Sequence, residues 1–416
     1  MSDFRILKNA NLMKLWSATL ISQLGTQVSF IALPLIAVTT LHSSSFQVSV
    51  LNALDFLPFA IFSLPIGAWV DKRSRRSIVI ASDIVRSIVL FSVPVAIHFD
   101  IRSIWLLYVV VFVVGSFSVS FDVASATLLP TIVQREQIQS GNAALQLSQS
   151  AAKIVGPSIA GGLISILTAP IAVILDCMSY LGSAVILLSL RVKYKAGRQN
   201  EAVTTSKPSM LSEVREGIGF VLHHDYLRHF AIFSGLSNFG WSIIEGILMV
   251  YVVRTLHFGP GLIGFIFTIS NLGLIVAASL SNFALKKLSL GTVIIVSSVL
   301  QGAGIVLVSM ASWYAPVILL TLGLLLRSYG VVSYGINAVS VRQNSTPDAM
   351  RGRVSATMRF ISWSTIPLGS IVGGLLATEM GVSHAIEIGA ILSVGAVILI
   401  AASPIRSITV TTTHEF

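Results

Sequence analysis

Apolar stretches dominate the chain, and short polar segments interrupt them. Twelve of these stretches are long enough for a helix that crosses a membrane, which needs about 20 residues. They cover residues 13–40, 45–70, 77–97, 103–128, 142–168, 170–190, 227–254, 259–284, 289–309, 312–340, 350–378 and 381–403. Because they are continuous, they do not fit an outer-membrane barrel, whose strands alternate apolar and polar residues. We therefore predict an all-α integral membrane protein with twelve transmembrane helices.

One long polar stretch, residues 191–226, separates the first six apolar stretches from the last six. It predicts three parts: an N-terminal six-helix bundle (1–190), a cytoplasmic linker (191–226) and a C-terminal six-helix bundle (227–416). Within the linker, Leu211, Val214, Ile218 and Leu222 recur at helical spacing. This spacing predicts an amphipathic helix on the membrane surface. The alternative is a linker without regular structure.

Composition and charge support a membrane location. Of the 416 residues, 54% are hydrophobic and 11% are charged, whereas soluble domains carry about 25% charged residues. An ordinary soluble enzyme is thereby excluded. The net charge of +10 comes from Lys and Arg that gather in alternate connections. By the positive-inside rule, this pattern places both termini in the cytoplasm. The basic charge therefore requires no nucleic-acid partner.

The two halves of the chain form a weak internal repeat with an offset of about 212 residues. Gly161 and Gly162 align with Gly373 and Gly374, and Asp176 aligns with Glu387 within one position. Parallel repeats of six spans are typical of secondary transporters, whose two bundles rock about a site near the middle of the bilayer.

Two short motifs carry a resemblance to a known family. Gly67, Asp71, Arg75 and Arg76 follow the second stretch, and they resemble the G-x-x-x-D-R-x-G-R-R loop of the major facilitator superfamily. Ser74 replaces the last Gly of that loop, and Lys72 and Arg73 flank the expected Arg. In the fifth stretch, residues 156–162 resemble the superfamily's antiporter motif, with a spacing one residue longer. Its members here are Gly156, Pro157, Gly161 and Gly162.

The resemblance implies the major facilitator fold and a transporter that has no enzymatic activity, cofactor or metal and is monomeric. Pro347–Asp348 and Arg351–Gly352, among other pieces, are similar to the exporter branch that contains the enterobactin and macrolide efflux proteins. In that family, Asp71 would lie at the start of the eleventh span, where Arg351 and Arg353 could bond to it. This contact would latch the two bundles together. The alternative is that the basic loop only fixes topology. The glycines and the proline of the fifth stretch would bend that helix; generic helix packing is the alternative.

Charges inside the apolar stretches are costly in a bilayer and usually have a partner or a function. By position they divide into three layers. An inner layer, which we interpret as a gating network, contains Asp83, Arg86, Asp122 and Arg359. An outer layer contains Asp176 and Glu387, which occupy equivalent positions in the repeat. These two therefore fit a scaffold or an extracellular gate better than substrate chemistry.

The central layer is the candidate substrate and coupling site. It contains Asp55, Lys153, Glu245 and Arg327, none of which has a charged counterpart in the other half. Asp55 and Glu245 are the candidates for proton coupling, because a buried carboxyl takes up a proton more readily and a nearby cation opposes this. Phe59 and Trp241 could line an apolar drug-binding cavity. The alternative is buried ion pairs that only stabilise packing.

Together with these features, the resemblance implies a proton-coupled antiporter that lies in the lipid bilayer of the bacterial inner membrane and exports small organic compounds. The carboxylates suit cationic drugs, and the basic residues suit acidic siderophores. An importer on the same fold and a non-transporting membrane receptor are the alternatives. A membrane-embedded enzyme is disfavoured, because the eight histidines all lie near the ends of the stretches or in loops. The histidine-rich segment 223–229 fits a polar interfacial segment better than a metal site.

Overall fold

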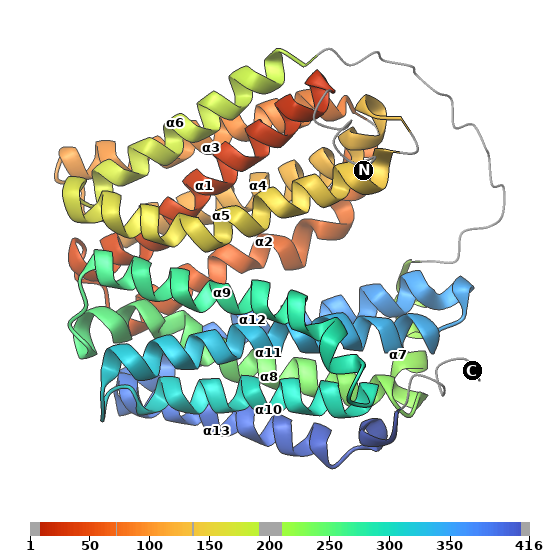
Figure 1. Cartoon of the computed structure of the whole chain (residues 1–416). Coiled ribbons are helices and arrows are strands. Elements are labelled where there is room, and N and C mark those ends of the chain that lie inside the picture. The colour runs from red at the N-terminus through yellow and green to blue at the C-terminus, as the bar shows by residue number, and fades with distance from the viewer. Residues whose placement is uncertain (1–8, 72, 135–136, 191–209, 409–416) are drawn as a thin grey trace. The chain divides into compact units, whose positions relative to one another are not determined.

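Helices form the described part of the chain, as the apolar pattern predicts (Figure 1). A computed structural model describes residues 9–71, 73–134, 137–190 and 210–408. The side chains at 63–65, 67, 68, 71, 210–214, 282 and 349 are outside the description. Within these ranges there is no strand, and twelve helices are long and apolar enough to cross a membrane. The predicted all-α integral membrane fold class is confirmed.

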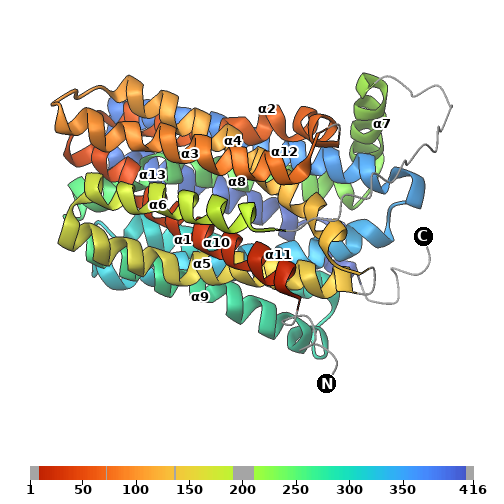
Figure 2. The ribbon, with the colours of Figure 1, turned by 90° about the horizontal axis from the view of Figure 1, so that it is seen from above.

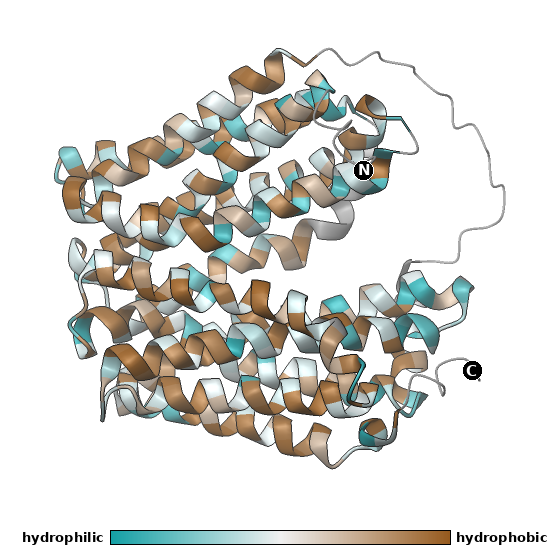
Figure 3. Cartoon of the chain, viewed as in Figure 1, coloured by the Kyte–Doolittle hydropathy of each residue, from teal (hydrophilic) through white to brown (hydrophobic). Residues whose placement is uncertain are grey.

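Contacts along the chain define two compact units. Unit 1 contains residues 1–200 and 258–268. Its helices are α1 (Ala10–Thr39), α2 (Ser45–Asp71), α3 (Arg75–His98), α4 (Ile104–Ile132), α5 (Ile138–Leu167), α6 (Ala169–Leu188) and the beginning of α9 (Pro260–Leu285). Hydrophobic positions run along each of these helices (Figure 3).

Unit 2 contains residues 201–257 and 269–416. Its helices are α7 (Met210–His223), α8 (Leu227–Val250), the rest of α9, α10 (Leu290–Met310), α11 (Pro316–Asn344), α12 (Arg351–Met380) and α13 (Val382–Ala401). A π-helical turn, Tyr251–Thr255, continues α8.

The same pairing of helices recurs in both units. In unit 1, α1 packs on α5 and α6, and α3 packs on α4 and α6; in unit 2, α8 packs on α12 and α13, and α10 packs on α11 and α13. The turns before the last helices also match: Thr168 and Gly381 both have positive φ, 78° and 88°. The structure thus carries the internal repeat that the sequence suggests.

Side-chain caps explain where several helices begin. The Asn9 side chain accepts hydrogen bonds from the main-chain N–H groups of Asn11 and Leu12, and Ser289 accepts one from Thr292. Short polar side chains satisfy N–H groups that have no partner within the helix. Because Asn9 caps the helix, α1 starts at Ala10, three residues before the apolar stretch that predicts it.

Each unit has an apolar core near the end where its first spanning helix begins. In unit 1, Leu12, Leu128 and Leu187 meet there; in unit 2, Phe230 and Val354 do. Inside a bilayer, close packing holds helices together more than removal of apolar surface from water does. Such cores therefore fix the rotation of each helix, and with it the direction of its few polar side chains.

The predicted linker, 191–226, lies partly outside the described residues, which omit 191–209. The second part of it forms α7, at the place expected for the amphipathic helix. α7 lies close to the start of α12 (Figure 2). A Cβ on Gly217 would be 3.0 Å from the Arg353 carbonyl oxygen, so the two backbones are nearly in contact. α7 is thus part of unit 2.

Candidate functional site

Unit 1 contains a buried ion pair on α3. Asp83 and Arg86 are 0% and 2% exposed, and Arg86 donates a hydrogen bond to the Asp83 carboxylate. The Arg86 Cζ also lies 4.6 Å from the centre of the Phe121 ring and 4.3 Å from that of Tyr180. Aromatic faces attract a cation and replace part of its lost hydration. The structure therefore joins α3, α4 and α6 around the charge of Arg86.

Asp176 on α6 belongs to this same network, whereas the sequence placed it in a separate outer layer with Glu387. Asp176 is fully buried, accepts a hydrogen bond from Ser29 on α1, and interacts electrostatically with Arg86. The reason is that Tyr180, one turn along α6, already covers Arg86. Gly25 lets α1 and α6 come close enough, because a Cβ there would overlap the Asp176 carboxylate.

Asp122 on α4 links this network to Lys153, one of the predicted central charges. It interacts electrostatically with both Arg86 and Lys153. Lys153 is an exposed residue of α5. The other unit 1 candidates, Asp55 and Phe59, are half-buried on α2. The predicted inner and central layers are therefore connected in unit 1 through Asp122.

In unit 2, Trp241, Glu245 and Arg327 come together. The Arg327 Cζ lies 3.5 Å from the centre of the Trp241 ring. Glu245, one turn further along α8, interacts electrostatically with Arg327. Trp241 is 5% exposed, whereas Glu245 and Arg327 are half-buried. Three of the predicted substrate-binding candidates thus form one cluster on α8 and α11.

Two further polar residues, which the sequence analysis missed, extend this cluster. Gln301 on α10 donates a hydrogen bond of 2.7 Å to Ser237, one turn before Trp241. The Trp241 Nε1 lies near Glu245 but makes no hydrogen bond of normal geometry, and the Gln301 Oε1 and Arg327 Nε are also buried without one. Buried polar atoms without a partner are rare. The isolated glutamine in the apolar stretch 289–309 was the signal that could have revealed this. We call Ser237, Trp241, Glu245, Gln301 and Arg327 the unit 2 polar cluster.

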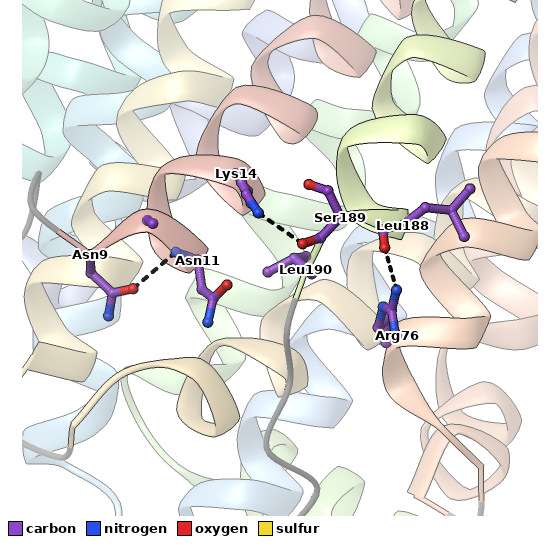
Figure 4. A pocket seen from close by; sticks show the side chains of 8 residues that line it. Asn9, Asn11, Lys14, Arg76, Leu188, Ser189 and Leu190 are labelled. Atoms are coloured by element: carbon purple, nitrogen blue, oxygen red, sulfur yellow. Dashed lines mark hydrogen bonds between the residues drawn. The ribbon is translucent and has the colours of Figure 1, made fainter.

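Arg76 of the first motif lines a surface pocket of about 890 Å³ at the end of α6 (Figure 4). Arg76 donates hydrogen bonds to the carbonyls of Leu187 and Leu188, and Lys14 donates one of 2.8 Å to that of Ser189. Cations favour helix C-termini, whose last carbonyls lack partners within the helix. Arg76 therefore caps α6.

The other members of the expected latch are placed only in part. Arg75 begins α3, and Gly67 and Asp71 belong to α2, but the Asp71 side chain is outside the description. Arg351, the first residue of α12, pairs with Asp348 in the 3-10 turn just before that helix, with 2.7 Å between Nη1 and Oδ1. Arg353 pairs with Glu216 of α7, at 2.5 Å. The latch itself stays a prediction.

The glycines of the second motif have different surroundings along α5, a single helix with Pro157 inside it. A Cβ on Gly156 would lie 2.5 Å from Gln27 on α1. A Cβ on Gly161 would lie 2.5 Å from the Pro260 carbonyl oxygen and 2.9 Å from the Cα of Gly264. Gly162 has open space around it. Gly161 thus allows α5 to contact the beginning of α9, which is why that segment groups with unit 1. Whether the motif bends α5 stays a prediction.

Two repeated helical units with charged residues inside their spans are typical of membrane transport proteins. Residues 15–370 match the family model of the Major Facilitator Superfamily. The chain belongs to this superfamily, and the resemblance stated from its motifs is confirmed.

Curated relatives match most of the chain at low identity. The multidrug efflux pump Tap of Mycolicibacterium fortuitum is 24% identical over 381 residues, which cover 90% of this chain and 91% of that protein. Macrolide efflux protein A of Streptococcus pyogenes is 20% identical over 374 residues, covering 89% and 90%. An uncharacterized transporter of the superfamily, YvqJ of Bacillus subtilis, is 22% identical over 352 residues, covering 83% and 81%.

Solved structures share the fold. The nucleoside transporter NupG superposes with a TM-score of 0.75 at 13% identity, covering 98% of this chain and 99% of that one. A bacterial homologue of the iron transporter ferroportin, in an inward-facing state, gives 0.70 at 16% identity, covering 94% and 98%. These identities show the fold alone, so substrate and direction must be argued from the residues.

Proposed function

We propose that this protein exports small organic compounds in exchange for protons, as an antiporter of the bacterial inner membrane with both termini in the cytoplasm. The observation that carries the proposal is the unit 2 polar cluster. It combines the aromatic Trp241 with the carboxylate of Glu245 and the cation of Arg327. An aromatic wall with a few placed polar groups is typical of sites for small organic molecules.

The relatives support export over import. Tap and macrolide efflux protein A are named for efflux, and each aligns with about nine-tenths of this chain. Drugs and siderophores are the substrate classes we propose. Glu245 and Asp55 offer a negative charge to a cationic drug, whereas Arg327 and Lys153 offer a positive charge to an acidic siderophore. Phe59 and Trp241 supply apolar surface.

Protons are the coupling ion we propose, through Glu245 and Asp55. Neutralising Glu245 by a proton would free Arg327 to bind an anionic or polar group of the substrate. The ionised carboxylate would compete for the same guanidinium. This competition is one physical route by which proton release and substrate binding could exclude each other.

Transport in everted membrane vesicles tests the proposal. The panel contains a macrolide, a cationic dye and an acidic siderophore, each measured with and without a proton ionophore. Glu245→Gln is compared with Glu379→Gln, an exposed glutamate at the end of α12. We expect ionophore-sensitive accumulation of at least one compound that Glu245→Gln lowers by tenfold or more and Glu379→Gln leaves unchanged. Accumulation only in right-side-out vesicles would instead identify an importer.

A further inference from the structure

The buried network of unit 1 contains more carboxyl groups than cations. Asp83 bonds directly to Arg86, and Asp122 is shared between Arg86 and Lys153. Asp176 shares Arg86 with both of the other carboxyl groups, at longer range. The titratable or charged groups that interact with Asp176, on its own helix and on the helices packed against it, are Asp83, Arg86, Cys177 and Tyr180. Asp176 is therefore the carboxyl group with the least compensation for a negative charge.

The hydrogen bonds to Asp176 do not make up this deficit. Ser29 donates one to Oδ2. The Ser179 hydroxyl lies 3.1 Å from Oδ1 but 2.8 Å from the main-chain carbonyl of Asp176, and its single hydrogen is shared between them. An ionised carboxylate can accept about four hydrogen bonds. A fully buried one without a direct cation is strongly disfavoured against its neutral form.

Arg86 still has unused bonding capacity toward a second carboxylate. Its Nε is buried and makes no hydrogen bond. The Asp83 carboxylate lies near the Ser183 hydroxyl, but its Oδ2 makes no hydrogen bond of normal geometry. The Phe121 and Tyr180 rings both contact the guanidinium, with their centres 4.6 and 4.3 Å from Cζ. A guanidinium held in this way can change its carboxylate partner without leaving the ring faces.

We propose that Asp176 is a proton-binding site, and that Asp83 and Asp176 share one proton and the one guanidinium of Arg86. The proton resides on the carboxyl group that Arg86 does not pair with. In the structure described here that group is Asp176. When Arg86 pairs with Asp176 instead, the O–H bond of Asp176 breaks and an O–H bond forms on Asp83. This adds a proton site in unit 1 to the proposed exchanger, separate from Asp55 and Glu245.

Infrared difference spectroscopy on the purified full-length protein in lipid tests this at neutral pH. A protonated carboxyl group has a C=O band separate from that of a carboxylate. We expect one C=O band of the wild type, distinct from any band of a protonated Asp55 or Glu245, to disappear in Asp176→Asn. It should also disappear in Asp83→Asn, because Arg86 would then pair with an ionised Asp176. The matched control is Asp100→Asn, an aspartate with a 76% exposed side chain, which should keep the band.

Several outcomes would overturn the proposal. A band that persists in Asp176→Asn belongs to another group, and one that persists in Asp83→Asn shows that the two carboxyl groups do not share Arg86. If Asp176→Asn fails to fold, because the asparagine NH2 group cannot accept a hydrogen bond from Ser29, the Asp83→Asn spectrum decides, and a band that persists there overturns the proposal. The infrared result does not depend on transport, so a failed export assay bears on the proposed function alone.

Discussion

The guanidinium of Arg327 lies on the face of the Trp241 indole, with Cζ 3.5 Å from the ring centre. The two residues come from α11 and α8 of unit 2. A tryptophan face is the best aromatic partner for a cation, and the attraction grows when water is excluded. The ring therefore stabilises the positive charge of Arg327, which Glu245 compensates only at longer range.

Replacing Trp241 tests this stack. Trp241→Phe keeps an aromatic face. Trp241→Leu removes it and leaves an aliphatic side chain of a size close to that of phenylalanine. Both variants lose the packing of the indole, so the informative quantity is the difference between their free energies of unfolding. We expect the leucine variant to be less stable by about 0.5–2 kcal/mol, measured by thermal unfolding in lipid nanodiscs. Equal stability of the two variants would show that Trp241 acts only by packing.

The pairing of Glu245 with Arg327 is testable by a double-mutant cycle. Glu245→Gln, Arg327→Gln and the double variant should give a coupling free energy of about 0.5–3 kcal/mol in thermal unfolding. Arg327→Gln should also weaken transport of acidic compounds more than that of neutral ones. Glu379→Gln combined with Arg327→Gln is the matched control and should be additive. Additive effects in the first cycle would contradict the pair.

The twelve spans and the repeat could be predicted because both follow from the order and spacing of residues along the chain. Continuous apolar length identifies a span, and the spacing of Gly161–Gly162 and Gly373–Gly374 identifies the offset. The grouping of Trp241 with Arg327 could be expected only in part. Depth along a helix can be counted from the sequence, which placed Glu245 and Arg327 in one layer. Trp241 was named separately, as an aromatic residue that could line a drug-binding cavity.

The rotation of each helix about its axis, and which helices pack against it, could not be obtained from the sequence in this way. Asp176 and Arg86 were assigned to different layers because depth along each helix was the only coordinate available. Their association depends on α6 packing on both α1 and α3. Gly25 allows that approach, and nothing in its local sequence distinguishes it from a glycine of ordinary helix packing. Gln301 was missed for a different reason: an uncharged side chain did not enter a search for charges.

Thr168 occupies a backbone conformation that suits glycine. Its φ is 78°, and the equivalent position in unit 2 is Gly381 with φ 88°. A β-branched residue with positive φ is strained, at a cost of about 1–3 kcal/mol. Thr168→Gly should therefore raise the thermal stability, by about 1 kcal/mol after the entropy of glycine is subtracted. Gly381→Thr should lower it, and a stability loss in Thr168→Gly would contradict the argument.

Two adjacent glycines of α5 should respond in opposite directions to the same change. In Gly161→Ala the new Cβ meets the backbone of Pro260 and Gly264. Backbone atoms cannot move aside as a flexible side chain can, so we expect a loss of about 1–3 kcal/mol. Gly162→Ala enters open space and should gain about 0.5–1 kcal/mol from helix propensity.

Thermal unfolding of these two variants side by side is the measurement. Because the sites are neighbours on one helix, differences in expression, lipid and depth cancel. A stability loss of equal size in both variants would mean that any alanine in this motif is harmful, for instance by stiffening α5. The close contact with α9 would then not be the cause.

His224 makes the stability of the α7–α8 corner depend on pH. Its Nδ1 accepts hydrogen bonds from the main-chain N–H groups of Tyr226 and Leu227, at 3.2 and 3.4 Å, where α8 begins. Burial lowers the pKa of His224 below its ordinary value of 6.5, and the charge of Asp225 opposes this shift. As the pH falls, the unfolded chain takes up the proton first. The stability contribution is therefore complete above pH 6.5 and is lost as the pH falls through the lower pKa of the folded protein.

His224→Asn isolates this effect, because an asparagine oxygen can still accept the N–H bonds but does not titrate. The matched control is His223→Asn, since His223 is exposed on the same turn. Thermal unfolding is measured between about pH 7.5 and pH 5. Wild type and His223→Asn should lose stability over this range, and His224→Asn should lose less. If all three curves fall in parallel, the pH dependence comes from other groups and the neutral cap at the start of α8 is not its source.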